Sequence, residues 1–232
     1  MAGFAGLPET KASALPYRPR IAALLTCHNR RELTLRCLTS LADAAKMSAG
    51  HVELETYLVD DGCTDGTGGA VRRQFPDVHV IVGTGDLYWC GGMRLAWKRA
   101  AENEYDGYLW LNDDVTLDSN ALDKLLDVAH RYGGVNEALI VVGATRNEGP
   151  VAAGAATYGG LSAQGVLPSS NDVRRIELFN GNIVLVSRRA FQVLGSLSSA
   201  YTHGLGDIDY GVRAKRAGVP VWLDACLHRQ RS

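Results

Sequence analysis

The sequence has no long apolar run and almost no net charge, and these two absences exclude several classes of protein. Its longest apolar segments, Ile21–Leu25 and Ala138–Ala144, are far shorter than the ~20 residues of a membrane-spanning helix. Met1–Arg20 has no apolar core of the kind found in secretory signals, so we expect a cytoplasmic protein. The 24 basic and 25 acidic residues give a net charge of −1, which provides no electrostatic footprint for nucleic acid.

Closely spaced cysteines are also absent. The five cysteines are odd in number and scattered over the sequence, at Cys27, Cys37, Cys63, Cys90 and Cys226. This distribution is typical of reduced cytosolic thiols and disfavours a disulfide framework or a zinc site. The 46% of hydrophobic residues is ordinary for a globular protein, and 232 residues suffice for one large domain.

Strands and helices alternate along the first part of the chain. Apolar runs bounded by polar loops predict strands at Ile21–Thr26, Leu54–Val59, Val78–Val82, Tyr108–Leu111 and Leu139–Thr145. Between them, apolar residues recur at helical spacing, as Cys37, Leu38 and Leu41 do. This alternation predicts an α/β domain in which helices flank a mostly parallel mixed sheet.

Beyond Thr145 the pattern becomes mixed. Arg146–Asn171 is rich in Gly, Ala, Ser and Pro and predicts a long irregular segment of the kind used as a lid or binding loop. Further strands and helices are expected at Arg174–Phe179, Ile183–Ser187, Arg188–Leu194, 207–218 and Val219–Leu223. Residues 1–20 are predicted as a flexible arm and 229–232 as a short tail, with one domain, 21–228, between them.

Three groups of acidic residues follow predicted strands or open a predicted helix: Asn112-Asp113-Asp114, Asp60-Asp61, and Asp207 with Asp209. Because the ends of parallel strands meet at one edge of a sheet, the first two groups would share a crevice. Such acids can contact a nucleotide, hold Mg²⁺ or Mn²⁺ on a diphosphate, or act as a general base. The alternative is that they are solvated or cap helices, and spacing alone does not choose among group transfer, hydrolysis and adenylylation.

The segment Gly83–Gly92 is a glycine-rich loop that follows a predicted strand. It resembles a dinucleotide fingerprint only weakly, because Tyr88 stands where the third glycine would be. Tyr88 and Trp89 are expected in a surface loop, where they would either stack on a base or sugar or be buried beneath the loop.

The acidic motifs resemble those of family-2 inverting glycosyltransferases with the GT-A fold. The matching segments are Thr26–Arg30, Val59–Thr67, Leu111–Asp114 in place of an Asp-x-Asp motif, and Gly206–Arg213 in place of a Glu-Asp-x-Asp motif. The resemblance covers about residues 21–228 and implies a nucleotide-binding half, 21–118, and an acceptor-binding half, 119–228. Leu87–Met93 further resembles bacterial members that build surface polysaccharides, including rhamnosyltransferase-like ones.

The resemblance also implies roles for individual residues. Asp207 matches the catalytic base, and Asp114 and His228 match ligands of a Mg²⁺ or Mn²⁺ ion. The implied nucleotide-binding residues are Thr26, Asn29, Asp60, Asp61, Asn112 and Asp113. The implied donor or acceptor contacts are Tyr88, Trp89, Gly92, Asp209 and Arg213.

Two residues depart from the family pattern, since Asn112 replaces the first Asp of Asp-x-Asp and Gly206 replaces the Glu before Asp207. For three other residues a plainer interpretation is open. Asp207 could be a helix N-cap, Asp209 and Arg213 could form an i,i+4 ion pair, and His228 could be a solvated residue of a basic tail.

The implied reaction moves a sugar from a UDP- or dTDP-sugar to a hydroxyl of a glycan or lipid-linked acceptor, with inversion, in bacterial polysaccharide biosynthesis. A lipid-linked acceptor would bring the protein into peripheral contact with the inner face of the cell membrane. Two alternatives remain. A sugar-phosphate nucleotidyltransferase should carry a glycine-rich loop after the first strand, where this chain has Cys27-His28-Asn29-Arg30. A non-catalytic nucleotide-sugar-binding or scaffold protein is compatible with Asn112 and Gly206.

Overall fold

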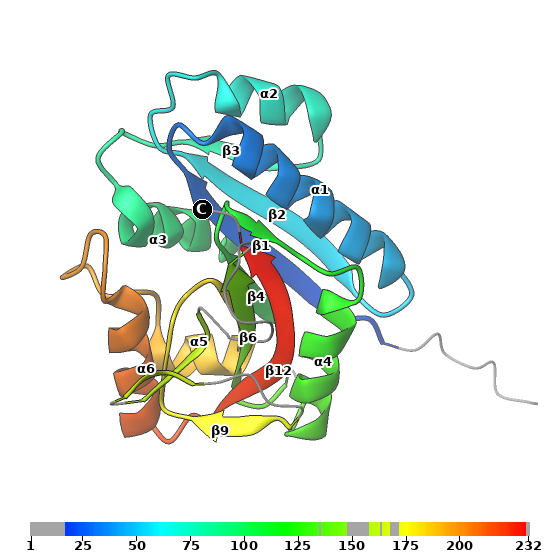
Figure 1. The fold of residues 1–232 in the computed structure, drawn as a ribbon, viewed down its shortest axis with the longest axis vertical. Coiled ribbons are helices and arrows are strands. Elements are labelled where there is room, and N and C mark those ends of the chain that lie inside the picture. Colours follow the sequence, from blue (N-terminus) through cyan, green and yellow to red (C-terminus); the bar gives the residue numbers. More distant parts are fainter. Residues whose placement is uncertain (1–16, 135, 148–157, 163, 168–171, 231–232) are drawn as a thin grey trace, which may run out of the picture.

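In the computed structural model, the chain builds one large mixed β-sheet with helices packed on both faces (Figure 1). The structure describes residues 17–134, 136–147, 158–162, 164–167 and 172–230. The sheet has the order β3-β2-β1-β4-β11-β6-β12-β5, with β9 also paired to β12. Its strands are β1 (Arg20–Cys27), β2 (Glu53–Asp60), β3 (His79–Val82), β4 (Gly107–Leu111), β5 (Val115–Thr116), β6 (Ile140–Asn147), β9 (Arg174–Ile176), β11 (Ile183–Ser187) and β12 (Val221–Gln230).

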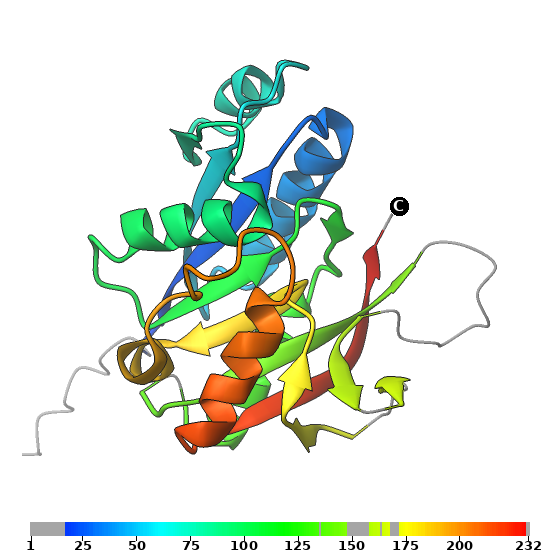
Figure 2. The same ribbon diagram turned by 90° about the vertical axis from the view of Figure 1, so that its left-hand side faces the viewer.

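In the described part of the chain, three helices cover each face of this sheet. In Figure 2, α3 (Tyr88–Ala100), α5 (Arg188–Leu194) and α6 (Gly206–Arg216) lie on the face turned toward the viewer. The helices α1 (Arg31–Met47), α2 (Thr67–Gln74) and α4 (Ala121–Arg131) lie beyond the sheet in that view. The predicted α/β architecture, a mostly parallel mixed sheet flanked by helices, is confirmed.

The strands are apolar on both sides because each side packs against helices. In β1, Ala23 and Leu25 pack in one core with the helices α1 and α4, whereas Ala22 and Leu24 pack in the other with α3 and α6. The run Tyr108–Leu111 of β4 alternates between the two cores in the same way. Successive strand residues point to opposite faces, so an uninterrupted apolar run is what a doubly covered strand needs.

The strand order reverses next to β1. The chain passes from β1 to β2 and β3 on one side, and then crosses through α3 to β4 on the other side. Crevices at the carboxyl ends of strands that flank such a reversal are where open α/β sheets bind ligands. The ends of β1 and β4 carry Thr26–Arg30 and Asn112–Asp114, so the topology places two of the predicted motifs there.

The C-terminal end of the sheet differs from the prediction. The prediction that the final strand is Val219–Leu223, followed by a short tail, is wrong. The strand β12 continues to Gln230, after a register shift between Asp224 and Leu227. The reason is that β6, its parallel partner, also runs on to Asn147 and pairs with β12 on both sides of this shift. Because the length of β12 depends on its pairing with β6, which is distant in sequence, the local sequence of β12 did not predict the extension.

The predicted irregular segment Arg146–Asn171 is also partly wrong. Where the structure describes it, the chain forms the short strands β7 (Gly160–Ser162) and β8 (Gly165–Val166), which join β10 (Leu178–Phe179) in a small antiparallel sheet. The predicted strand Arg174–Phe179 is therefore divided between two sheets, as β9 and β10. Within this segment, residues 148–157, 163 and 168–171 lie outside the described residues, as do residues 1–16 of the predicted arm; Arg20 already belongs to β1.

Candidate active site

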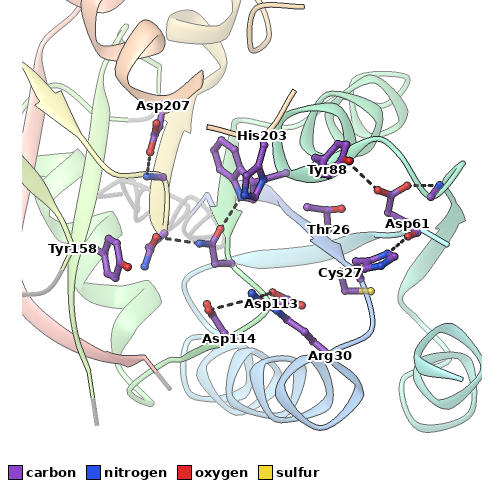
Figure 3. A pocket seen from close by; sticks show the side chains of 16 residues that line it. Thr26, Cys27, Arg30, Asp61, Tyr88, Asp113, Asp114, Tyr158, His203 and Asp207 are labelled. Carbon is purple, nitrogen blue, oxygen red and sulfur yellow. Dashed lines mark hydrogen bonds and ion pairs between the residues drawn. The ribbon is translucent and has the colours of Figure 1, made fainter. Parts of the chain in front are cut away.

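A cavity of about 560 Å³ opens at the ends of β1 and β4, in the size range of small-molecule sites (Figure 3). Of the residues predicted to form the site, those that line it are Thr26, Asp61, Tyr88, Trp89, Asn112, Asp113, Asp114 and Asp207. Asp61 and Tyr88 lie toward one end, Asp207 and Tyr158 toward the other, and Asp113, Asp114 and Arg30 between them. Both halves of the chain therefore contribute to one cavity.

Asp113 and Asp114 share one cationic side chain. The Arg30 Nη1 lies 3.4 Å from Asp113 Oδ1 and 3.3 Å from Asp114 Oδ2. Arg30 is half exposed, whereas the side chains of Asp113 and Asp114 are only 8% and 13% exposed. Together, the two enclosed carboxylates and the accessible guanidinium form the Asp113–Asp114–Arg30 group. With both carboxylates ionised, this group carries one net negative charge.

The surroundings of Asp113 fit an additional cation. Burial raises the pKa of Asp113 from 3.8 to about 6, Arg30 lowers this pKa, and Asp114 raises it. Thr34 Oγ1 also donates to Asp113 Oδ2, at 3.3 Å. A divalent cation would relieve the repulsion between the two carboxylates, and oxygen ligands of this kind suit Mg²⁺ or Mn²⁺. Asp114 and Asp113 are the residues that would hold it.

Asp61 organises the opposite end of the cavity through its backbone contacts. Its Oδ1 accepts from the Gly85 N–H at 2.8 Å, and its Oδ2 accepts from the N–H groups of Leu87 and Tyr88 at 3.0 Å. These bonds satisfy donors at the start of α3, as a capping residue does. The prediction of a surface loop at Tyr88 and Trp89 is wrong for this reason: the helix begins at Tyr88, and Asp61, which directly follows β2, accepts hydrogen bonds from its first N–H groups.

Asn29 and Asp60 hold neighbouring loops rather than line the cavity. The Asn29 Oδ1 accepts from the Thr64 N–H at 2.7 Å and the Asp65 N–H at 3.3 Å. Asp60 Oδ1 accepts from the Cys63 N–H at 3.0 Å. Ligand atoms of Asp60, Cys27 and Cys63 lie within 4.8 Å of one another, but thiol donors suit zinc rather than Mg²⁺.

Asp207 is the second residue of α6, so it is not the N-cap; that position is held by Leu205. Its Oδ2 accepts from the Gly181 N–H at 2.8 Å, and its Oδ1 accepts from the Ile208 N–H at 2.9 Å. A carboxylate in the first turn of a helix is stabilised by the helix dipole. The side chain is thus held in a fixed orientation at the wall of the cavity.

At position 206, where the family pattern has Glu, the structure leaves no room for a side chain. A Cβ on Gly206 would lie 2.5 Å from the Cys90 Sγ of α3, so a larger residue would displace the helix contact. Gly92 is likewise a packing residue, because a Cβ added there would clash with Thr26 Oγ1 of β1. These two glycines allow α3 to approach both α6 and β1 closely.

Two other predicted residues, Asp209 and Arg213, are not among the described residues that line the cavity. Asp209 and Arg213 form the i,i+4 ion pair, with 2.8 Å between Asp209 Oδ2 and Arg213 Nε, and Arg213 also donates to the Ser196 carbonyl. His228 lies in β12 in register with Thr145, and its side chain is outside the described part of the structure.

Several lining residues were not predicted, namely Cys27, His28, Arg30, Gly85, Tyr158, Gly181, Asn182 and His203. His203 comes from the loop before α6, and its ring centroid lies 5.8 Å from that of Tyr88. The loop is fixed to α3 by the Cys90 N–H, which donates to the Thr202 carbonyl at 2.9 Å. Arg30 lies within a recognised motif, whereas no local sequence signal marks His203 or Gly181.

Comparisons with known proteins agree with this arrangement. The sequence profile described as glycosyl transferase family 2 matches residues 23–153. Two similar solved structures are S. aureus TarS 1-349 with UDP and with UDP-GlcNAc, at 14% and 13% identity and TM-scores of 0.63 and 0.62. Each alignment covers 92% of this chain, but only 60% and 58% of the TarS chain.

At this identity the TarS structures establish a shared fold, and no curated protein matches the chain. The family profile covers more than half of the chain, including the first two acidic motifs and the cavity-lining ends of β1 and β4. The chain belongs to glycosyl transferase family 2.

Proposed function

We propose that this chain transfers a sugar from a nucleoside-diphosphate sugar to an acceptor hydroxyl, with inversion at the anomeric carbon. The observation that carries the proposal is that Asp207 lines the same cavity as the Asp113–Asp114–Arg30 group. The reaction requires that the leaving diphosphate be stabilised and the attacking hydroxyl be deprotonated, at two places a few ångströms apart. One cavity with a carboxylate at one wall and a cation-binding group at another meets that need.

The leaving group belongs at the Asp113–Asp114–Arg30 group in this proposal. Asp114, with Asp113 and His228, would hold a Mg²⁺ or Mn²⁺ ion, which when bound supplies positive charge against a diphosphate. Arg30 is accessible on the same side and is suited to bind phosphate oxygens. The base and ribose of the nucleotide are proposed to lie at the other end of the cavity. There they would be bound by Thr26, Asn29, Asp60 and Asp61, either through direct contact or through the loops that these residues hold in place.

Proton removal belongs at Asp207. An ionised carboxylate accepts the proton of the acceptor hydroxyl as that oxygen attacks the sugar. Since a sugar hydroxyl is a weak acid, a fixed orientation of the base matters more than a raised pKa. The backbone N–H groups of Gly181 and Ile208 give Asp207 that orientation. Attack on the face opposite the leaving diphosphate inverts the anomeric centre.

The donor is proposed to be a UDP- or dTDP-sugar and the acceptor a glycan or lipid-linked hydroxyl in polysaccharide biosynthesis. The TarS structures with UDP and UDP-GlcNAc support a nucleotide sugar as the ligand class. Tyr88, which is 58% exposed, and His203, whose ring lies 5.8 Å from that of Tyr88, are proposed as contacts of the donor, because Tyr88 lies toward the Asp61 end of the cavity. A cytoplasmic protein in peripheral membrane contact fits such an acceptor; among the described residues, no helix is long and apolar enough to cross a membrane.

The test combines ligand binding with one substitution. A panel of nucleotide sugars, with and without Mn²⁺, should contain one that raises the melting temperature, because a ligand that binds only the folded state stabilises it. With that donor, Asp207→Asn should keep binding and lose transfer, whereas the control Asp209→Asn should keep both. Undiminished transfer by Asp207→Asn would eliminate Asp207 as the base, and donor binding without transfer by the wild type would favour the non-catalytic alternative.

A further inference from the structure

Asn112 stands where the family pattern has the first acid of the Asp-x-Asp motif, but its side-chain amide is engaged within the protein. Its Oδ1 accepts from the Trp89 Nε1–H at 2.7 Å, and its Nδ2 donates to Asn182 Oδ1 at 3.0 Å. The indole N–H is only a donor, so the amide oxygen of Asn112 must face Trp89 and the amide nitrogen must face Asn182. The backbone N–H of Asn112 also donates to the Asn182 carbonyl, at 3.0 Å.

These contacts lead directly to Asp207. The residue before Asn182 is Gly181, whose N–H donates to Asp207 Oδ2. A Cβ on Gly181 would lie 2.6 Å from Trp89 Cη2 and 3.3 Å from Asp207 Cβ. The indole of Trp89 therefore lies against the Gly181 backbone, and Asn112 contacts both the indole and the turn that holds Asp207.

We propose that Asn112 is a positioning residue for Asp207. It fixes the Trp89 indole and the Gly181–Asn182 turn, and these two together hold the carboxylate in the orientation for proton removal. The inference rests on the proposed function and gives Asn112 a different role from nucleotide contact. It also explains the departure from the family pattern, because an amide can accept from Trp89 and donate to Asn182 at the same time, whereas a carboxylate only accepts.

The substitution Asn112→Asp separates the two roles. If Asn112 is a weakened ligand of the nucleotide or cation, a carboxylate restores the family motif and should raise both Mn²⁺-dependent UDP affinity and kcat. If Asn112 positions Asp207, the carboxylate places an oxygen against Asn182 Oδ1 and loosens the turn. We expect UDP affinity with Mn²⁺ to be unchanged or higher and kcat to fall about tenfold to hundredfold.

Two further measurements exclude a general loss of structure. The loss in Asn112→Asp should fall on kcat, while KM for the donor stays within about twofold of the wild type, because the donor still binds when the base is misplaced. In the double variant with Trp89→Phe, kcat should fall no more than about twofold below the poorer single variant, as for two residues that act through one contact. Asn120→Asp, at the start of α4, is the matched control and should leave kcat and the KM for the donor unchanged.

A readout without turnover is the indole resonance of Trp89 in a ¹⁵N-labelled sample, identified by its loss in Trp89→Phe. It should shift in Asn112→Ala and stay in place in Asn120→Asp. An unmoved resonance in Asn112→Ala, or wild-type kcat in Asn112→Asp, would overturn the positioning role. Failure of the proposed function looks different, since the wild type would then transfer no sugar while the Trp89 resonance still responded to Asn112→Ala.

Discussion

Asp60-Asp61 and Asp113-Asp114 follow the same pattern, two acids at the end of a buried parallel strand, but the folded chain engages them differently. The carboxylates of Asp60 and Asp61 accept from backbone N–H groups of the loops beside them. Those of Asp113 and Asp114 face a guanidinium from another segment, which is half exposed. The first pair therefore fixes the backbone that shapes the cavity, and the second presents charge that a ligand can use.

This difference indicates that pairs of acids in a recognised motif are not interchangeable in role. Hydrogen bonds to backbone donors are directional and keep a loop in place. An ion pair with an accessible arginine can be exchanged for a bound cation or phosphate, because the arginine can turn into solvent.

The largest effect on stability is expected at Asp61. Asp61→Ala removes the acceptor of three backbone N–H groups, at Gly85, Leu87 and Tyr88, and should lower the free energy of unfolding by about 2–4 kcal/mol. Urea unfolding of the purified variants measures this loss. Asp114→Ala is the comparison and should cost less than about 1 kcal/mol; equal losses at the two sites would remove the proposed contrast.

The next effect is a pH dependence at Asp113, whose pKa burial raises to about 6. Because the folded-state pKa is above the unfolded value, the folded state retains the proton when the unfolded chain has lost it. The contribution of Asp113 to stability is therefore full below pH 4 and declines by about 2–3 kcal/mol as the pH rises to 6. The difference in unfolding free energy between wild type and Asp113→Asn, measured from pH 4 to 7, should follow this curve; a flat difference contradicts it.

A smaller effect is expected on cation affinity. Arg30→Gln removes a positive charge 3.3–3.4 Å from both carboxylates, so Mn²⁺ should bind roughly three- to tenfold more tightly at pH 8 without nucleotide. Electron paramagnetic resonance of free Mn²⁺ measures this affinity. The neighbouring substitution Arg31→Gln serves as the control, and unchanged affinity in Arg30→Gln would place the cation elsewhere.

The smallest effect is expected at Asp209. Its ion pair with Arg213 is i,i+4 and partly exposed, and Arg213 has other partners on the preceding loop. Asp209→Asn should reduce the unfolding free energy by only about 0.5 kcal/mol and leave transfer intact. A large loss of transfer with preserved stability would assign Asp209 to the acceptor site after all.

Local patterns were sufficient to predict much of the fold. The apolar runs of β1 and β4 predicted buried strands, and strand–helix alternation predicted the parallel part of the sheet, because these features depend on residues close in sequence. The start of α3 and the length of β12 depend instead on Asp61 and on β6, which are distant in sequence, and they were predicted wrongly. Lining residues such as His203 and Gly181 were missed for the same reason.

The central claim is that one cavity holds the leaving group at Asp114 and removes the proton at Asp207. The most direct test is calorimetric titration of UDP, with Mn²⁺ or with a chelator, in Asp114→Asn and Asp207→Asn, combined with their transfer rates. We predict that Asp114→Asn loses the Mn²⁺-dependent part of UDP affinity, that Asp207→Asn keeps it, and that both lose transfer. UDP affinity that depends on Mn²⁺ equally in both variants, or transfer retained by Asp207→Asn, would contradict the claim.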